Sequence, residues 1–145
     1  MGVRSRSRKA LIQARYAAEV NNRTLLANLE DIKRYLADPD MGIGVPFETE
    51  DWNWISSLAE AVSDNRVEID SRIADVLENW TLDRLSLMTR LILEQALGEM
   101  YYFSPPTPLP VIIDEAVELA KTFDADETAG FVNSVLDSVF GKKGN

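Results

Sequence analysis

The chain has 145 residues, of which 46% are hydrophobic and 27% are charged, a composition typical of a folded soluble protein the size of one domain. Its net charge is −9, and it contains no cysteine and no histidine. The absence of cysteine and histidine excludes disulfides, cysteine nucleophiles and histidine-based catalytic triads, and we therefore expect no enzymatic activity.

The first fifteen residues are strongly basic although the whole chain is acidic. They contain no acid and five cations, Arg4, Arg6, Arg8, Lys9 and Arg15, so the remaining residues carry a net charge of −14. Such segregation indicates an arm that binds a polyanion. In a helix, Arg4, Arg8 and Arg15 would share a broad cationic face, whose charge a phosphate backbone could compensate. A solvated terminus and pairing with acids elsewhere in the chain remain alternatives.

Hydrophobic periodicity predicts helices from the first residues onward. The first helix is expected over about 5–21, and the second begins at Thr24 and ends before the Asp-Pro-Asp sequence of 38–40. Glycine and proline then predict a flexible loop over about 38–48. Thr49 is a candidate N-cap for the third helix.

The same periodicity continues in the second half of the chain. A fourth helix is expected to run towards Trp80, and Thr81 is a candidate cap for a long apolar fifth helix over about 82–102, which should be buried on several sides. Four prolines in 104–110 interrupt the pattern, and a sixth helix follows from Val111.

The last segment is also helical. Asp126 is a candidate cap for a seventh helix, which carries the apolar residues from Phe131 to Val139. No segment alternates like a strand for long, so the expected fold class is all-α in a single domain. No stretch approaches the roughly 18 apolar residues of a membrane span, and no secretory signal is visible. An arginine- and serine-rich transit peptide at the N-terminus is the alternative.

Two sets of side chains invite a chemical interpretation. Asp114, Glu115 and Glu118 could bind a metal or carry out acid–base chemistry, but we interpret them as acids that favour the first turn of a helix. Exposed aromatic rings could stack on unpaired bases, although most of them are expected in the core. Phe123 and Phe131 are the better stacking candidates, since they flank the acidic turn between the last two helices.

Three segments together resemble one known family. Residues 110–123 read PVIIDEAVELAKTF and residues 131–137 read FVNSVLD. The start of the chain combines its arginines with the sequence QARY at 13–16, and the middle segment of 69–99 has a matching pattern. Read together, these segments resemble the NusB family of bacterial transcription antitermination factors.

The resemblance implies a fold, a function and partners. It implies an all-α helical bundle of about seven helices in two packed three-helix halves, forming a single domain over 1–145 with a basic arm at about 1–9. It also implies binding to boxA-like RNA together with NusE, a ribosomal small-subunit protein, in an antitermination complex on RNA polymerase that supports ribosomal RNA transcription. The expected protein is bacterial and cytoplasmic, has no enzymatic activity, cofactor, metal or membrane association, and is a possible homodimer.

The family's functional positions can be carried over residue by residue. The resemblance implies that RNA is bound by nine residues: Arg4, Arg6, Arg8, Lys9, Tyr16, Asp83, Phe123, Glu127 and Phe131. Asn133 matches the asparagine of the last motif, and we expect its amide to fix the final helix rather than to contact RNA.

The chain also departs from the family pattern. Ser5 and Ser7 interrupt the arginine run, and the other departures are Arg15, Thr89, Glu94, Gly98, Asp114 and Ser134. We expect several of them to lie on or near partner surfaces, which leaves two alternatives open. One is a protein-interaction module with reduced RNA binding, and the other is an accessory domain related to those of ribosomal RNA cytosine methyltransferases.

Overall fold

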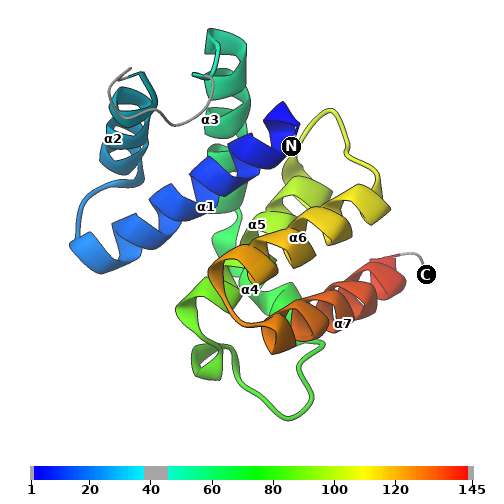
Figure 1. Ribbon diagram of the computed structural model, residues 1–145. Coiled ribbons are helices and arrows are strands. Elements are labelled where there is room, and N and C mark those ends of the chain that lie inside the picture. The colour runs from blue at the N-terminus through cyan, green and yellow to red at the C-terminus, as the bar shows by residue number, and fades with distance from the viewer. Residues whose placement is uncertain (1, 38–45, 144–145) are drawn as a thin grey trace. The chain divides into compact units, whose positions relative to one another are not determined.

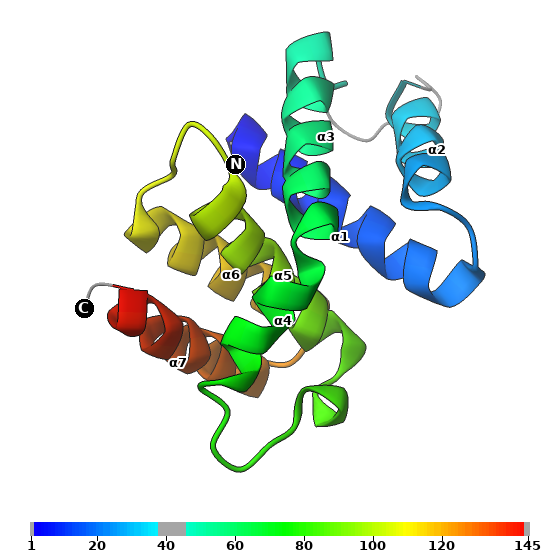
Figure 2. The ribbon, with the colours of Figure 1, turned by 180° about the vertical axis from the view of Figure 1, so that it is seen from behind.

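The computed structural model describes residues 2–37 and 46–143 and contains no strand in these ranges (Figures 1 and 2). Its helices are α1 (Val3–Asn21), α2 (Leu25–Ala37), α3 (Thr49–Asp64), α4 (Arg66–Ala74), α5 (Leu87–Tyr102), α6 (Leu109–Phe123) and α7 (Asp126–Lys143), with a short 3-10 helix η2 (Leu82–Arg84) before α5. The predicted all-α class is confirmed. The predicted loop falls mostly on 38–45, outside the described residues.

The contacts divide the chain into two compact units, residues 1–57 and 58–145, and each is described by itself. The first contains α1, α2 and the beginning of α3. The second contains the end of α3 together with α4, η2, α5, α6 and α7. No helix of the described ranges has the length and apolar character needed to cross a membrane.

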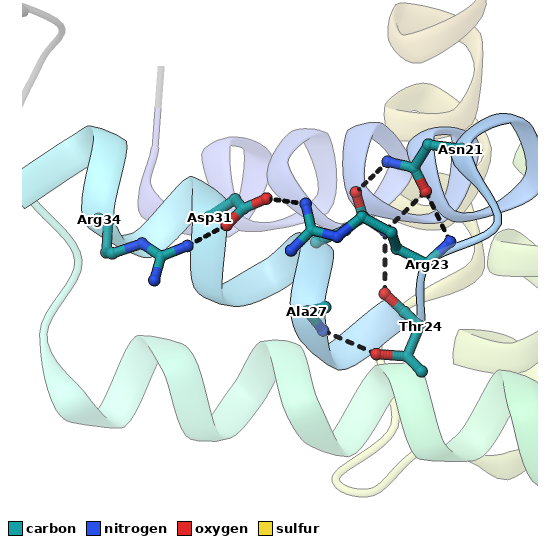
Figure 3. Close-up of polar contacts among 7 residues, drawn as sticks. Asn21, Arg23, Thr24, Ala27, Asp31 and Arg34 are labelled. Carbon is teal, nitrogen blue, oxygen red and sulfur yellow. Dashed lines mark hydrogen bonds and ion pairs between the residues drawn. The ribbon is translucent and has the colours of Figure 1, made fainter.

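In the first unit, a polar turn connects α1 to α2 (Figure 3). Asn22 ends α1 in the left-handed conformation, with φ at 57°, which asparagine tolerates better than most residues. The Asn21 amide donates to Asn28 Oδ1 at 2.8 Å, and Thr24 Oγ1 accepts from the Ala27 N–H at 3.0 Å. The predicted end of the first helix and the predicted start of the second are therefore confirmed, and α2 packs back against α1.

In the second unit, α5 is the central helix. Every residue from 91 to 99 is buried, and α5 packs against α4, α6 and α7, while α6 and α7 pack side by side (Figures 1 and 2). The fully buried side chains of this unit are mainly aliphatic: Leu58, Ile69, Ile73, Leu91, Ile92, Leu93, Leu97, Ile112 and Leu136. Burying each contributes about 1.5–3 kcal/mol. The predicted burial of this helix on several sides is confirmed.

Two predicted helix boundaries between α4 and α5 are wrong. The α4 helix ends at Ala74 rather than near Trp80, because the amides of Val76 and Leu77 bond to carbonyls only three residues back, as Val76 N does to Ile73 O at 3.1 Å. The α5 helix begins at Leu87 rather than 82. Its cap is Ser86, whose hydroxyl accepts from the Thr89 N–H at 3.2 Å, and not Thr81.

Two other predicted caps are wrong, since Thr49 and Asp126 are the first helical residues of α3 and α7. At α3 the capping interaction comes from Asp51, whose Oδ2 accepts from the Glu48 N–H at 2.9 Å.

The sixth helix also starts earlier than expected. It begins at Leu109, so Pro110 lies within its first turn, where a missing N–H costs no hydrogen bond. Asp114 and Glu118 therefore lie beyond the first turn, and the helix dipole does not account for them. Glu118 instead pairs with Lys121 at 3.6 Å, and the described residues contain no cluster of acids able to hold a metal.

The expectation that most of the considered aromatics belong to the core is wrong. Trp80 is 50% exposed, and the others are half-buried: Trp52, Trp54, Tyr101, Tyr102, Phe103, Phe123 and Phe131. Several of these rings carry a cation instead, as Tyr101 does with the Arg72 guanidinium at 4.1 Å and Trp80 with that of Arg84 at 5.3 Å. The largest fully buried side chains of the described residues are leucines and isoleucines, and the buried core also contains the ring of Phe140.

Candidate RNA-binding site

The arginines of α1 are held by acidic and aromatic side chains of the same unit. Arg4 Nη1 lies 3.0 Å from Asp51 Oδ1, and the Arg4 guanidinium lies 5.0 Å from the centre of a Trp54 ring. Arg8 lies over Trp54 at 5.2 Å. Such cation–π contacts fix the position of a guanidinium while it keeps its charge. Asp51 thus joins α1 to α3 while its second oxygen caps α3.

These contacts differ from the open cationic face that periodicity predicts. Arg8 is only 5% exposed and Arg15 only 6%, so neither belongs to an open surface. The Arg4 side chain is 34% exposed, and Arg6 and Lys9 are half-buried. Of the alternatives weighed for the basic stretch, pairing with an acid elsewhere in the chain is observed, at Arg4 and Asp51.

Tyr16 lies further along α1 and is 39% exposed. The first unit therefore contains five of the nine predicted RNA-binding residues, all on one helix.

The other four predicted residues lie in the second unit. Phe123 ends α6, and Glu127 and Phe131 lie in the first two turns of α7, one helical turn apart. Glu127 is exposed, whereas both phenylalanines are half-buried. Asp83 lies in η2 and is exposed, and a hydrogen bond from the Thr81 side chain lowers the pKa of its carboxyl.

The segment of Asp83 is tied to the α6–α7 turn. Asp124 Oδ2 accepts hydrogen bonds from Ser86 Oγ at 3.2 Å and from Thr89 Oγ1 at 3.3 Å. Asp124 directly follows Phe123, so these bonds connect the start of α5 to the turn that carries the two phenylalanines. The structure thus brings together the local segments of Asp83 and Phe123 within this unit.

Three departures from the family pattern are buried inside the second unit, contrary to the expectation that they lie on partner surfaces. Thr89 is 5% exposed and bonds to Ser86 and Asp124. Glu94 has no exposure, and its Oε2 lies 3.0 Å from Arg66 Nε.

Gly98 is buried against α3. A Cβ atom at this position would lie 2.4 Å from Val62 Cγ2, so the glycine permits the close approach of the two helices. In the first unit, Arg15 is buried too. These four residues belong to packed regions rather than to exposed surfaces.

Sequence reasoning missed residues that support the site. The sequence predicted Asp51 only as an acid in the first turn of a helix, and it predicted Asp124 only as part of a turn. Trp54 and Phe47 face arginines of α1, with the Arg6 guanidinium 4.8 Å from the Phe47 ring centre. Arginines and aromatic residues far apart in the sequence gave no signal that they would meet.

Asn133 has the local role that its motif predicts. Its amide donates to Asp137 Oδ2 at 3.4 Å, one turn further along α7. The side chain is exposed, and this bond stays within the helix.

Comparison with known proteins agrees with these features. The model of the NusB family matches residues 5–140. The transcription antitermination protein NusB of Geotalea uraniireducens is 31% identical over 96% of this chain and 94% of its own length. That of Elusimicrobium minutum is 29% identical over 100% of this chain and 98% of its own length.

Solved structures show the same fold. The structure of T. maritima NusB matches with a TM-score of 0.79 and 30% identity, covering 94% of this chain and 89% of that one. A crystal structure of the antitermination factors NusB and NusE in complex with double-stranded RNA matches with a TM-score of 0.78 at 18% identity, covering 97% of both chains. The family model and the full-length relatives place the chain: it belongs to the NusB family.

Proposed function

We propose that this protein is an RNA-binding transcription antitermination factor of the bacterial cytoplasm that binds boxA-like RNA together with NusE and joins an antitermination complex on RNA polymerase. The observation that carries this proposal is the basic start of α1 in an otherwise acidic chain that has the NusB fold. The two full-length relatives bear the name transcription antitermination protein.

The proposed mechanism begins with electrostatic attraction. The residues after the first fifteen carry a net charge of −14, so RNA should be repelled from most of the chain and drawn to α1. There, Arg4, Arg6 and Lys9 would contact phosphates, and each contact releases condensed counterions. Such contacts position the RNA without reading its sequence.

The burial of Arg8 supports a different role for this residue in the proposal. At 5% exposure and stacked on Trp54, Arg8 would hold α1 in place rather than contact a phosphate. Tyr16 is exposed enough to stack on an unpaired base.

The proposed contribution of the second unit is selection among bases. Phe123 and Phe131 would offer ring edges or faces, and the carboxylates of Asp83 and Glu127 would accept hydrogen bonds from base amino groups. The bonds between Asp124 and the start of α5 would keep these segments in register. A single domain over 1–145, self-association of the protein and the absence of catalysis stay predictions.

Joint binding of RNA and NusE tests the proposal. The full chain should bind boxA-like RNA and NusE more tightly together than either partner alone, as measured by fluorescence anisotropy of labelled RNA with and without NusE. NusE binding that is indifferent to RNA would instead support a protein-interaction module. Absence of RNA binding at low salt, with or without NusE, contradicts the proposal.

A further inference from the structure

A cavity of about 570 Å³ lies in the first unit between α1 and α2. Pockets for small organic ligands are typically about 300–1,000 Å³, so this one has room for a group of that size. Its walls include the small side chains Ala10 and Ala17 of α1 and the aliphatic side chains Ile32 and Leu36 of α2. These residues give the cavity a predominantly apolar surface.

Charge at the cavity favours an anionic ligand. Among the described residues that line the cavity, Arg6 and Lys9 are cationic and Asp31 is acidic. Asp31 accepts hydrogen bonds from both Arg23 and Arg34 (Figure 3). The bond from Arg23 is the main cause that lowers the pKa of Asp31, and both arginines form ion pairs with this carboxylate.

Polar groups suited to reading a ligand also line the cavity. Gln13 and Tyr35 are exposed, and neither side chain forms a hydrogen bond with any part of the chain that the structure describes. The ring of Phe47 lines the same cavity and holds the Arg6 guanidinium at 4.8 Å. The cavity therefore combines apolar walls, an aromatic ring, two cations and an available amide and hydroxyl.

We infer that this cavity receives one unpaired nucleotide of the bound RNA, its base between α1 and α2 and its phosphate beside Arg6 and Lys9. This inference rests on the proposed function. A base has apolar faces and a polar edge, and proteins that extract a base hold it by stacking and by hydrogen bonds to that edge. An aliphatic side chain of a protein partner fits less well, because it would bury the Gln13 amide and the Tyr35 hydroxyl without partners.

The experiment combines a filled cavity with a base-deletion series. Ala17→Phe fills the cavity without changing charge, and Val20→Phe, at a position of α1 that is 59% exposed and outside the cavity, is the matched control. Binding is measured for a short single-stranded boxA-like RNA and for copies in which each base in turn is replaced by an abasic site. Thermal melting of each variant reports its fold.

We expect one abasic position to weaken binding to the unmodified protein about tenfold, the loss of one stacked base. Ala17→Phe should weaken binding of the intact RNA by a similar factor, and its affinity should not fall further when that base is removed. Val20→Phe should behave like the unmodified protein. Gln13→Ala, an exposed substitution, should reduce the sensitivity to the same position.

Other outcomes contradict the inference in distinguishable ways. The cavity holds no base if Ala17→Phe binds intact RNA with normal affinity. The same conclusion follows if Ala17→Phe lowers the affinity for every abasic RNA by the same factor, and in both cases the proposed function stands. If Ala17→Phe weakens binding to NusE alone, the cavity receives a protein side chain. If the unmodified protein binds no RNA, the proposed function and this inference both fail.

Discussion

Glu94 carries its charge at a position with no solvent exposure. Its Oε2 lies 3.0 Å from Arg66 Nε and 3.4 Å from Arg90 Nε, and Arg90 also bonds to Asp70 at 2.9 Å. These ion pairs fasten α4 to α5. The bond to Asp70 raises the pKa of Arg90, as expected for a guanidinium stabilised by its carboxylate partners.

Glu94→Gln should destabilise the protein, because it leaves the positive charges of Arg66 and Arg90 without their shared partner. Removing one member of a fully buried pair costs about 3–5 kcal/mol, and the partial exposure of both arginines should reduce this to about 2 kcal/mol. Urea unfolding measures the loss. The control is Glu60→Gln at an exposed site of α3, expected within about 0.5 kcal/mol of the unmodified protein. Equal stability of the two variants would contradict a stabilising role for the network.

The pKa of Asp83 offers a second test at a single residue. The hydrogen bond from the Thr81 side chain is the main cause that lowers it from the ordinary value of 3.8, with help from the Asp83 backbone N–H. The ionised Asp83 carboxylate therefore stabilises the folded protein at pH values above its ordinary pKa. This contribution to stability is lost as the pH falls through the lowered pKa of the folded state. Thr81→Ala should raise the pKa of Asp83, and Thr81→Ser should preserve it.

Carboxyl ¹³C chemical shifts followed through acid pH measure this pKa directly. An Asp83 that titrates at the same pH in the unmodified protein and in Thr81→Ala would show that the hydrogen bond has no effect in solution.

At the scale of helices, Gly98 and Gly130 form a natural pair for comparison. A Cβ atom at Gly98 would meet Val62 Cγ2 at 2.4 Å, whereas one at Gly130 in α7 would meet no atom of the described residues within 4 Å. Gly98→Ala should therefore cost about 1–3 kcal/mol through overpacking of α3 against α5. Gly130→Ala should stabilise by about 0.5–1 kcal/mol, because alanine loses less backbone entropy in a helix.

Thermal or urea unfolding of both variants checks this prediction. The loss of stability caused by Gly98→Ala should be smaller in a Val62→Ala background, because the Cγ2 atom that the new methyl group would contact is then absent. A stabilising Gly98→Ala, or an equal cost in both backgrounds, would contradict the close approach of the helices.

Periodicity located the helices well and some of their ends poorly. The end of α1 and the start of α2 were readable because asparagine and threonine act there through local bonds. The α4–α5 connection was not, since Val76 and Leu77 continue the apolar spacing of α4 beyond its end. Which hydroxyl caps a helix depends on competing hydrogen bonds, and spacing alone does not decide between Thr81 and Ser86.

For the molecule as a whole, hydrophobic periodicity predicted the all-α class, the motifs predicted the family, and the charge distribution pointed to an anionic partner. The sequence did not reveal which cations are accessible. Arg8 and Arg15 are as basic in the sequence as Arg6, and only packing separates the two buried arginines from their half-buried neighbour. Thr89 and Glu94 are also buried and therefore cannot belong to a partner surface. Their polar groups bond to Asp124 and Arg66, which are distant in sequence, so the sequence alone did not predict their burial.

In the proposed function, the start of α1 binds RNA through its phosphates. The most direct measurement is the dependence of RNA affinity on salt for the unmodified chain and for Arg6→Gln/Lys9→Gln. Each lost phosphate contact with a single strand should reduce the slope of log affinity against log salt by about 0.7, so the double variant should lose about 1.4.

The control is Lys33→Gln/Arg72→Gln, which removes the same charge from exposed positions of α2 and α4. We predict that it keeps the slope of the unmodified protein. An unchanged slope in Arg6→Gln/Lys9→Gln, or an equal decrease in the control, would contradict the account.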